Sequence, residues 1–170
     1  WPLAGGFALT ALGSAILLAQ LWPLLTALGV PMGLAILAAS TIGPAQVAAR
    51  VLLMLAGARV SAWQVSLGAF ILLSLAALTI GAAAALPVLA LVFAVAQGMG
   101  NGVISILRPV VTREVMGEVG FGESAGAVAR LSLFAFAIAP GLGALLADAA
   151  GYGAAILFCV SAPLLGAPLL

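Results

Sequence analysis

The stretch "LPVLALVFAVAQGMGNGVISILRP" (residues 86–109) begins as an unbroken apolar run and then changes to glutamine, asparagine and alternating glycines. A helix needs roughly 20 apolar residues to cross a bilayer core about 30 Å thick, and this stretch is long enough. Its apolar run lacks the two-residue alternation that marks the strands of a membrane barrel. The stretch therefore predicts a transmembrane helix whose second half carries polar side chains.

The whole chain has the composition of an integral membrane protein. It is 66% hydrophobic and 5% charged, whereas a soluble domain carries roughly 25% charged residues because its surface faces water. All the cations are arginine, and they form no basic run of the kind that binds nucleic acid. We therefore expect the lipid bilayer as a partner and no contact with nucleic acid.

Proline, glycine and charged residues divide the chain into six helical spans within one membrane domain, residues 1–170. The expected spans are roughly 3–25, 32–56, 62–84, 87–108, 126–147 and 153–170. A polar connector, residues 109–125, joins the fourth span to the fifth. The chain starts with Trp-Pro and ends in an apolar run, so we expect a fragment of a longer protein, with a processed small protein as the alternative.

Arginine placement predicts the orientation of the spans. Arg59 lies in the turn after the second span, and the 109–125 connector contains or adjoins Arg108, Arg113 and Arg130. The other connections contain no cation, only Asp148. Because cytoplasmic loops are enriched in arginine and lysine, we expect a multi-pass protein of the plasma or cell inner membrane, with both ends of this chain in the cytoplasm.

Polar side chains in the fourth span form one face of the expected helix. Gln97, Asn101 and Ser105 are spaced four residues apart. Arg108 extends this face to the cytoplasmic end. Amides that face lipid would lose their hydrogen-bond partners, so the face points into the protein and either lines a substrate cavity or joins neighbouring helices by hydrogen bonds. Gln20, in the first span, is a further cavity candidate.

Small residues and prolines predict where helices pack closely or bend. Gly98 and Gly102 form a small-xxx-small pair beside the polar face, whereas Gly100 is expected to add flexibility. Proline within a span removes a backbone hydrogen bond and kinks the helix. The residues that we expect to kink or to permit close packing are Pro44, Gly98, Gly102, Pro140, Gly141 and Gly143.

The second span carries Gln46 and Arg50 four residues apart, on one face. Arginine at the bilayer centre costs about 2.5–3.5 kcal/mol on insertion scales. Arg50 is about 10 Å from the expected helix end at Gly57, so its side chain can extend toward the membrane surface. We therefore favour a structural or gating role over direct substrate binding. The candidates for a cytoplasmic gate are Gln46, Arg50, Arg59 and Arg108.

No residue pattern indicates catalysis or metal binding. The chain has no histidine, and its single cysteine, Cys159, lies in an apolar run. Asp148 has no nucleophile or base at a useful spacing, and the glutamates lie in the connector. We expect neither an enzyme nor a bound metal or cofactor.

Three segments resemble the second half of a major facilitator superfamily transporter, the last six of its twelve spans. They are "LLTALGVPMGLAILAASTIGPAQVAARVLLMLAGAR" (residues 24–59), "TREVMGEVGFGESAGAVAR" (residues 112–130) and "APGLGALLADAAGYG" (residues 139–153). In the first segment, Gly43, Arg50, Gly57 and Arg59 are similar to part of the family's Gly-rich, Arg-ended cytoplasmic loop motif.

The resemblance implies a fold and a function. The fold would be half of a twelve-helix bundle, built from two inverted three-helix units. The function would be secondary active transport of a small solute by alternating access, with the substrate site between this half and an N-terminal six-helix half. The alternative from a different class is a self-contained six-helix membrane protein that acts as a channel-like oligomer or a scaffold.

Overall fold

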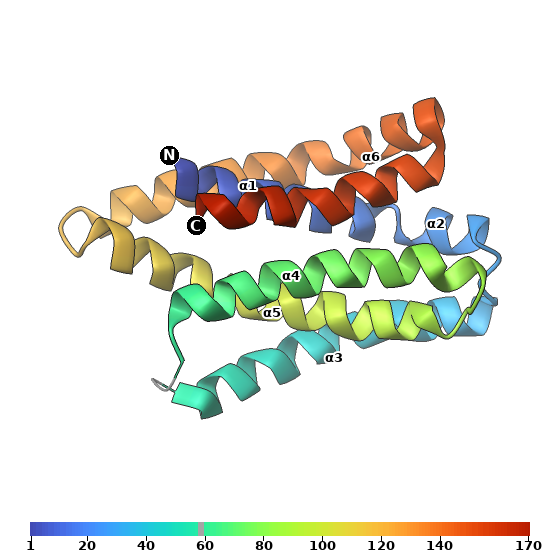
Figure 1. Cartoon of the computed structure of the whole chain (residues 1–170), viewed down its shortest axis with the longest axis horizontal. Helices are drawn as coiled ribbons and strands as arrows, with labels where there is room; N and C mark the ends of the chain where they lie inside the picture. Colours follow the sequence, from blue (N-terminus) through green and yellow to red (C-terminus); the bar gives the residue numbers. More distant parts are fainter. Residues whose placement is uncertain (58–59) are drawn as a thin grey trace.

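The computed structural model describes residues 1–57 and 60–170, and within these ranges the chain is helical throughout, without a strand. Figure 1 shows the helices packed lengthwise into one bundle. The α-helices are α1 (Pro2–Ala19), α2 (Leu21–Ala27), α3 (Met32–Ala56), α4 (Ala62–Gly81), α5 (Leu89–Met116) and α6 (Phe121–Gly166). The described residues also form the short 3-10 helices η2 (Ala82–Ala84) and η3 (Ala167–Leu169).

The outside of the bundle is apolar, as a bilayer requires. Within residues 1–57 and 60–170, five helices are long and apolar enough to cross a membrane, namely α1, α3, α4 with η2, α5, and α6 with η3. Large hydrophobic side chains point outward, for example Met54 at 76% and Phe134 at 65% exposure. Because a soluble protein would bury such side chains, the prediction of an all-helical membrane protein is confirmed at this level.

Helix α6 is interrupted at Gly151. Its 46 residues would make a straight helix about 69 Å long, more than twice the bilayer core of roughly 30 Å. Gly151 has φ 78° and ψ 167°, a conformation that side-chain-bearing residues rarely adopt, and the chain reverses its direction there (Figure 1). We call residues 121–150 the first arm of α6 and residues 152–166 its second arm.

Two helix boundaries differ from the expected ones. The span expected at 3–25 is divided at Gln20 into α1 and α2. Pro23 lacks the N–H that would bond to the carbonyl of Ala19, but it is tolerated in the first turn of the new helix. Helix α5 continues beyond Pro109 to Met116, so the connector expected at 109–125 is reduced to residues 117–120. Gly117, with φ 80°, ends α5.

The first and last parts of the chain pack tightly against each other. A Cβ atom at Gly6 of α1 would lie only 2.7 Å from the carbonyl oxygen of Gly166, in the second arm of α6. A Cβ atom at Gly13 would lie 3.2 Å from the Cβ of Ala162. Small residues thus bring the two backbones together, and the N and C labels of Figure 1 lie at the same end of the bundle as the α5–α6 connector. We call this the connector end, after residues 117–120.

Candidate functional site

Helices α3 and α5 approach each other along a line of small residues. A Cβ atom at Gly98 would lie 2.5 Å from the carbonyl oxygen of Ile42, and one at Gly102 would lie 2.5 Å from that of Gln46. The two helices therefore run in the same direction, with Gln46 level with Gly102. Since Arg50 is one turn beyond Gln46, it lies nearer the connector end.

Gly100 takes part in packing on the other side of α5. A Cβ atom there would lie 2.7 Å from the Leu73 side chain of α4. The sequence suggested flexibility at this glycine, but the structure gives it a contact surface. Alternating glycines in α5 thus serve two neighbouring helices, because residues two apart point to different sides of a helix.

A cavity of about 270 Å³ lies beside the α3–α5 contact. Helices α3 and α5 contribute polar groups to it: Gln46, Arg50, Asn101, Ser105 and Arg108. Helices α1 and α5 and the first arm of α6 contribute apolar walls: Phe7, Ala11, Leu18, Ile104 and Phe136. Thr10 completes the lining. Five residues singled out from the sequence therefore meet at one place. We call it the arginine cavity, defined by these eleven residues.

The two arginines of the cavity have no counter-charge among the residues described. Arg50 is exposed and Arg108 is half-buried. The ion pair found within residues 1–57 and 60–170 joins Arg113 to Glu118 at the connector end, outside the cavity, and both of its side chains are solvent-exposed. No described carboxylate lines the cavity. Each guanidinium carries five N–H donors, so this wall of the cavity is rich in unused donors.

The hydroxyl groups of the cavity are already used within their own helices. The Ser105 hydroxyl donates to the carbonyl of Gly102 at 2.7 Å, and the Thr10 hydroxyl donates to that of Gly6 at 3.0 Å. Such local bonds are common for hydroxyls in apolar helices. These two residues keep only acceptor capacity toward the cavity. The free donors come from the arginines and the amides.

Gln97 and Asn101 share a helix face but differ in surroundings. Asn101 lines the arginine cavity, although its Nδ2 atom is buried without a partner among the described residues. Gln97 is one turn farther from the connector end, is fully buried, and does not line the cavity. Both of its side-chain polar atoms lack a hydrogen-bond partner within the described part of the chain. An unsatisfied buried polar group costs about 1–3 kcal/mol.

Gln20 lies away from the cavity, at the break between α1 and α2. Its Nε2 atom donates to the carbonyl oxygen of Pro140, at 3.3 Å. A Cβ atom at Gly143 would lie 3.0 Å from the Gln20 Cγ, so this glycine makes room for the amide. Gln20 therefore ties the helix break to the first arm of α6.

The remaining predicted residues lie at scattered places. Pro44 and Pro140 are within helices α3 and α6, each on an exposed face. Gly141 has no neighbouring atom within 4 Å of the position of a Cβ. Arg59 lies outside the described residues, so its expected place at the gate has no structural counterpart here.

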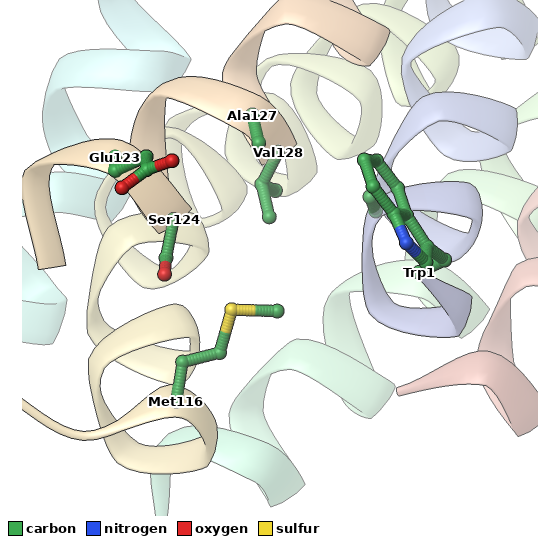
Figure 2. Close-up of a pocket in the computed structure, with 7 residues that line it drawn as sticks. Trp1, Met116, Glu123, Ser124, Ala127 and Val128 are labelled. Atoms are coloured by element: carbon green, nitrogen blue, oxygen red, sulfur yellow. The ribbon is translucent and has the colours of Figure 1, made fainter. Parts of the chain in front are cut away.

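A second pocket, of about 280 Å³, lies at the connector end between the start of α1, the end of α5 and the start of α6. Figure 2 shows Trp1 on one side of it and Met116 and Ser124 on the other. Its charged group is Glu123, which is exposed to solvent. None of the predicted site residues lines this pocket, so the arginine cavity is the better candidate site.

The sequence reasoning did not find the aromatic walls of the cavity. Phe7 is 1% exposed and meets Phe70 of α4 edge to face, with ring centroids 5.7 Å apart. Phe136 is 44% exposed and lies on the first arm of α6. An aromatic residue in an apolar span has no local signal that separates a cavity wall from a lipid-facing side chain. Phe7 and Phe136 line the cavity only because helices that are far apart in the sequence pack together.

No family model matches the chain, and no curated protein is significantly similar to it. Within the described residues, no group of three or more histidine, cysteine, aspartate or glutamate side chains could hold a metal ion. The fold defines the class: an all-helical membrane protein. The resemblance to the major facilitator superfamily remains a prediction.

Proposed function

We propose that this chain is the C-terminal half of a secondary active transporter that binds a small solute in the arginine cavity. One observation carries the proposal: polar and cationic side chains of α3 and α5 meet in one cavity inside otherwise apolar helices. Charged residues within membrane spans are costly, about 2.5–3.5 kcal/mol each on insertion scales, and they commonly mark a pathway for solutes or ions.

The proposed topology has six spans. We infer that α1 with α2 forms the first span, that α3, α4 and α5 form the next three, and that each arm of α6 crosses the membrane once. The reversal at Gly151 supports this assignment, since the first arm alone is long enough to cross the bilayer core. With six spans both chain ends lie on one side, and the arginines of the connector end favour the cytoplasm for that side.

In this proposal, alternating access opens the cavity first to one side of the membrane and then to the other. A matching N-terminal six-helix half would form the opposite wall. An ion-pair gate at Arg50 and Arg108 would need carboxylates, and the described residues supply none within this cavity. The counter-charge would therefore come from the other half or from the solute.

The alternative is a six-helix protein that works alone, as a channel-like oligomer or a scaffold. The burial of Gln97 favours it, because an amide that is sealed between helices acts in packing rather than in transport. Helix α3 is consistent with it as well. Its buried residues are one stripe toward α5 (Ala35, Ala38, Ile42, Ala45 and Ala49), which leaves its other faces open to a second copy.

Transport by the purified full-length protein in liposomes tests the proposal. We would measure uptake of a panel of small anionic, neutral and cationic solutes, and then repeat the assay with Asn101→Leu for the solute that is moved. We expect uptake to fall by about tenfold, because the substitution removes an amide that lines the cavity. Gln64→Leu, an exposed amide at the start of α4, is the matched control and should leave uptake unchanged.

Two results would count against the proposal. The first is the absence of uptake for every class of solute by folded wild-type protein. The second is an Asn101→Leu variant that transports as well as the control, which would favour the six-helix alternative.

A further inference from the structure

We propose that the solute of the arginine cavity is a small organic anion, with an oxyanion group bound by Arg50 and Arg108 and an apolar body against the aromatic walls. The inference rests on the proposed function, since it names the substrate class of the same site. A carboxylate and a phosphonate share the required oxyanion chemistry.

The charge of the cavity is of one sign. Its two charged residues are both arginines, one from α3 and one from α5. Two like charges in a medium of low dielectric constant repel each other, and each desolvated charge is costly without a partner. An oxyanion between the two helices would offset both costs, whereas a neutral or cationic solute would leave them in place.

The residue type suits an oxyanion. The guanidinium group presents its donors as a planar fork that matches a carboxylate or phosphate oxygen pair. The Gln46 amide, one turn before Arg50, adds a further N–H donor to the lining of the cavity. The hydroxyls of Thr10 and Ser105 already donate to their own helices and leave the arginines as the main ligands.

The remaining walls of the cavity are apolar and favour a solute with an apolar body. Phe7, Leu18, Ile104 and Phe136 line the cavity beside the polar groups. An inorganic anion would gain little from these walls, because the hydrophobic effect rewards only the burial of apolar surface. The volume of about 270 Å³ falls just below the usual range of roughly 300–1,000 Å³ for ligand pockets. The solute should therefore be small and amphipathic.

The competing explanation is that both arginines only extend their side chains toward the membrane surface. In that case they would bind water and lipid headgroups, and their replacement would not alter the affinity for a small solute. Headgroup binding would also not depend on the apolar body of the ligand. The two explanations therefore differ in a measurable way.

A set of matched ligands tests the inference on the purified full-length protein. Phenylacetate and phenylacetamide have the same shape and differ in charge, phenylphosphonate carries the other oxyanion, and inorganic phosphate lacks the apolar body. We would measure Kd for each by isothermal titration calorimetry. We expect phenylacetate or phenylphosphonate to bind, and phenylacetamide and inorganic phosphate to bind at least about tenfold more weakly, as for the loss of one charge-assisted contact.

Arginine variants locate the binding. Arg50→Gln and Arg108→Gln should each weaken binding of the preferred anion by about tenfold or more. Arg130→Gln is the matched control, because Arg130 is exposed on the first arm of α6 and does not line the cavity. Size-exclusion profiles of the variants would show that they remain folded. If a cavity variant is misfolded, Gln46→Leu replaces it and should weaken the same anion.

The outcomes separate this inference from the proposed function. Uptake of neutral or cationic solutes without preference for an anion, or anion binding that survives both cavity variants, would overturn the inference and leave the transporter proposal standing. Anion binding that the cavity variants abolish, in a protein that transports nothing, would support the anion site and overturn the transporter proposal.

Discussion

Two close helix contacts in this bundle use the same kind of residue and have different surroundings. In the contact of α1 with the second arm of α6, Gly6 meets Gly166, and the nearby Thr10 hydroxyl bonds to its own helix. In the contact of α3 with α5, Gly102 meets Gln46, and two arginines without a counter-charge in the described part of the chain lie alongside. Small residues explain both contacts. What distinguishes the candidate site is the group of polar and cationic side chains that lines the cavity, not the close packing.

The largest expected effect comes from adding one methyl group to each contact. Gly102→Ala would place its Cβ 2.5 Å from a backbone oxygen of α3, and Gly166→Ala would place its Cβ 2.7 Å from one of α1. Backbone atoms yield little, so each should lower the free energy of unfolding by about 1–3 kcal/mol. Denaturation in detergent micelles would measure this. Only Gly102→Ala should also weaken solute binding.

Gly43→Ala is the control for both, because Gly43 is a glycine of α3 with no neighbouring atom within 4 Å of the added Cβ. It should leave stability unchanged or slightly raised, since alanine favours the helix over glycine. Equal loss of solute binding in Gly102→Ala and Gly166→Ala would contradict the distinction between the two contacts.

The next largest effect is expected at Gln97. This residue is buried, as are the residues of the α1–α6 contact, but it lies on α5, the helix that carries Asn101, Ser105 and Arg108. Gln97→Leu should raise the free energy of unfolding by about 1 kcal/mol, because it removes two buried polar atoms that have no hydrogen-bond partner among the described residues. The same denaturation measurement would test it, with uptake expected to be unchanged. A loss of stability would instead show that Gln97 has a hydrogen-bond partner, for example a bound water, in the folded protein.

A smaller effect is expected at the α1–α2 break. Gln20→Leu keeps most of the side-chain volume against Gly143 but loses the hydrogen bond to the Pro140 carbonyl. The expected loss of stability is about 0.5–1.5 kcal/mol, the usual net value of one hydrogen bond. If Gln20 instead contributes to the solute site, the variant will reduce uptake by more than its stability accounts for.

The smallest effect is expected at Thr10. Thr10→Val keeps the shape of the side chain and removes a hydroxyl that bonds within its own helix. Because the carbonyl of Gly6 remains in the helix ladder, stability and solute affinity should change by less than about 0.5 kcal/mol. A large loss of affinity would show that this hydroxyl contacts the solute in the cavity.

The four-residue spacing predicted which face of α5 carries polar side chains. It did not predict how far the cavity extends along that face. Residues four apart share a helix face, which is why Asn101, Ser105 and Arg108 could be grouped before the structure. The same rule included Gln97, yet the cavity ends before it. Where a cavity ends depends on the neighbouring helices, and no periodicity within one helix contains that information.

The sequence also predicted helix content better than helix ends. Charges after Pro109 indicated a loop, but charged side chains at a membrane surface are solvated equally well on a helix, and α5 continues to Met116. The apolar run around Pro23 suggested one span, but the helix breaks at Gln20, three residues before that proline. The pairing of Gly6 with Gly166 had no local signal, because the two residues are far apart in the sequence.

That long separation has a consequence for the way the protein is made. Helix α1 leaves the ribosome roughly 7–27 seconds before the second arm of α6, because about 130 residues separate them and synthesis proceeds at roughly 5–20 residues per second. During that interval the glycine-lined surface of α1 must be sheltered by lipid or by the insertion machinery. The reversal at Gly151 then brings the second arm of α6 back against α1. We therefore expect substitutions at Gly151 to reduce the amount of folded protein in the membrane before they reduce its activity.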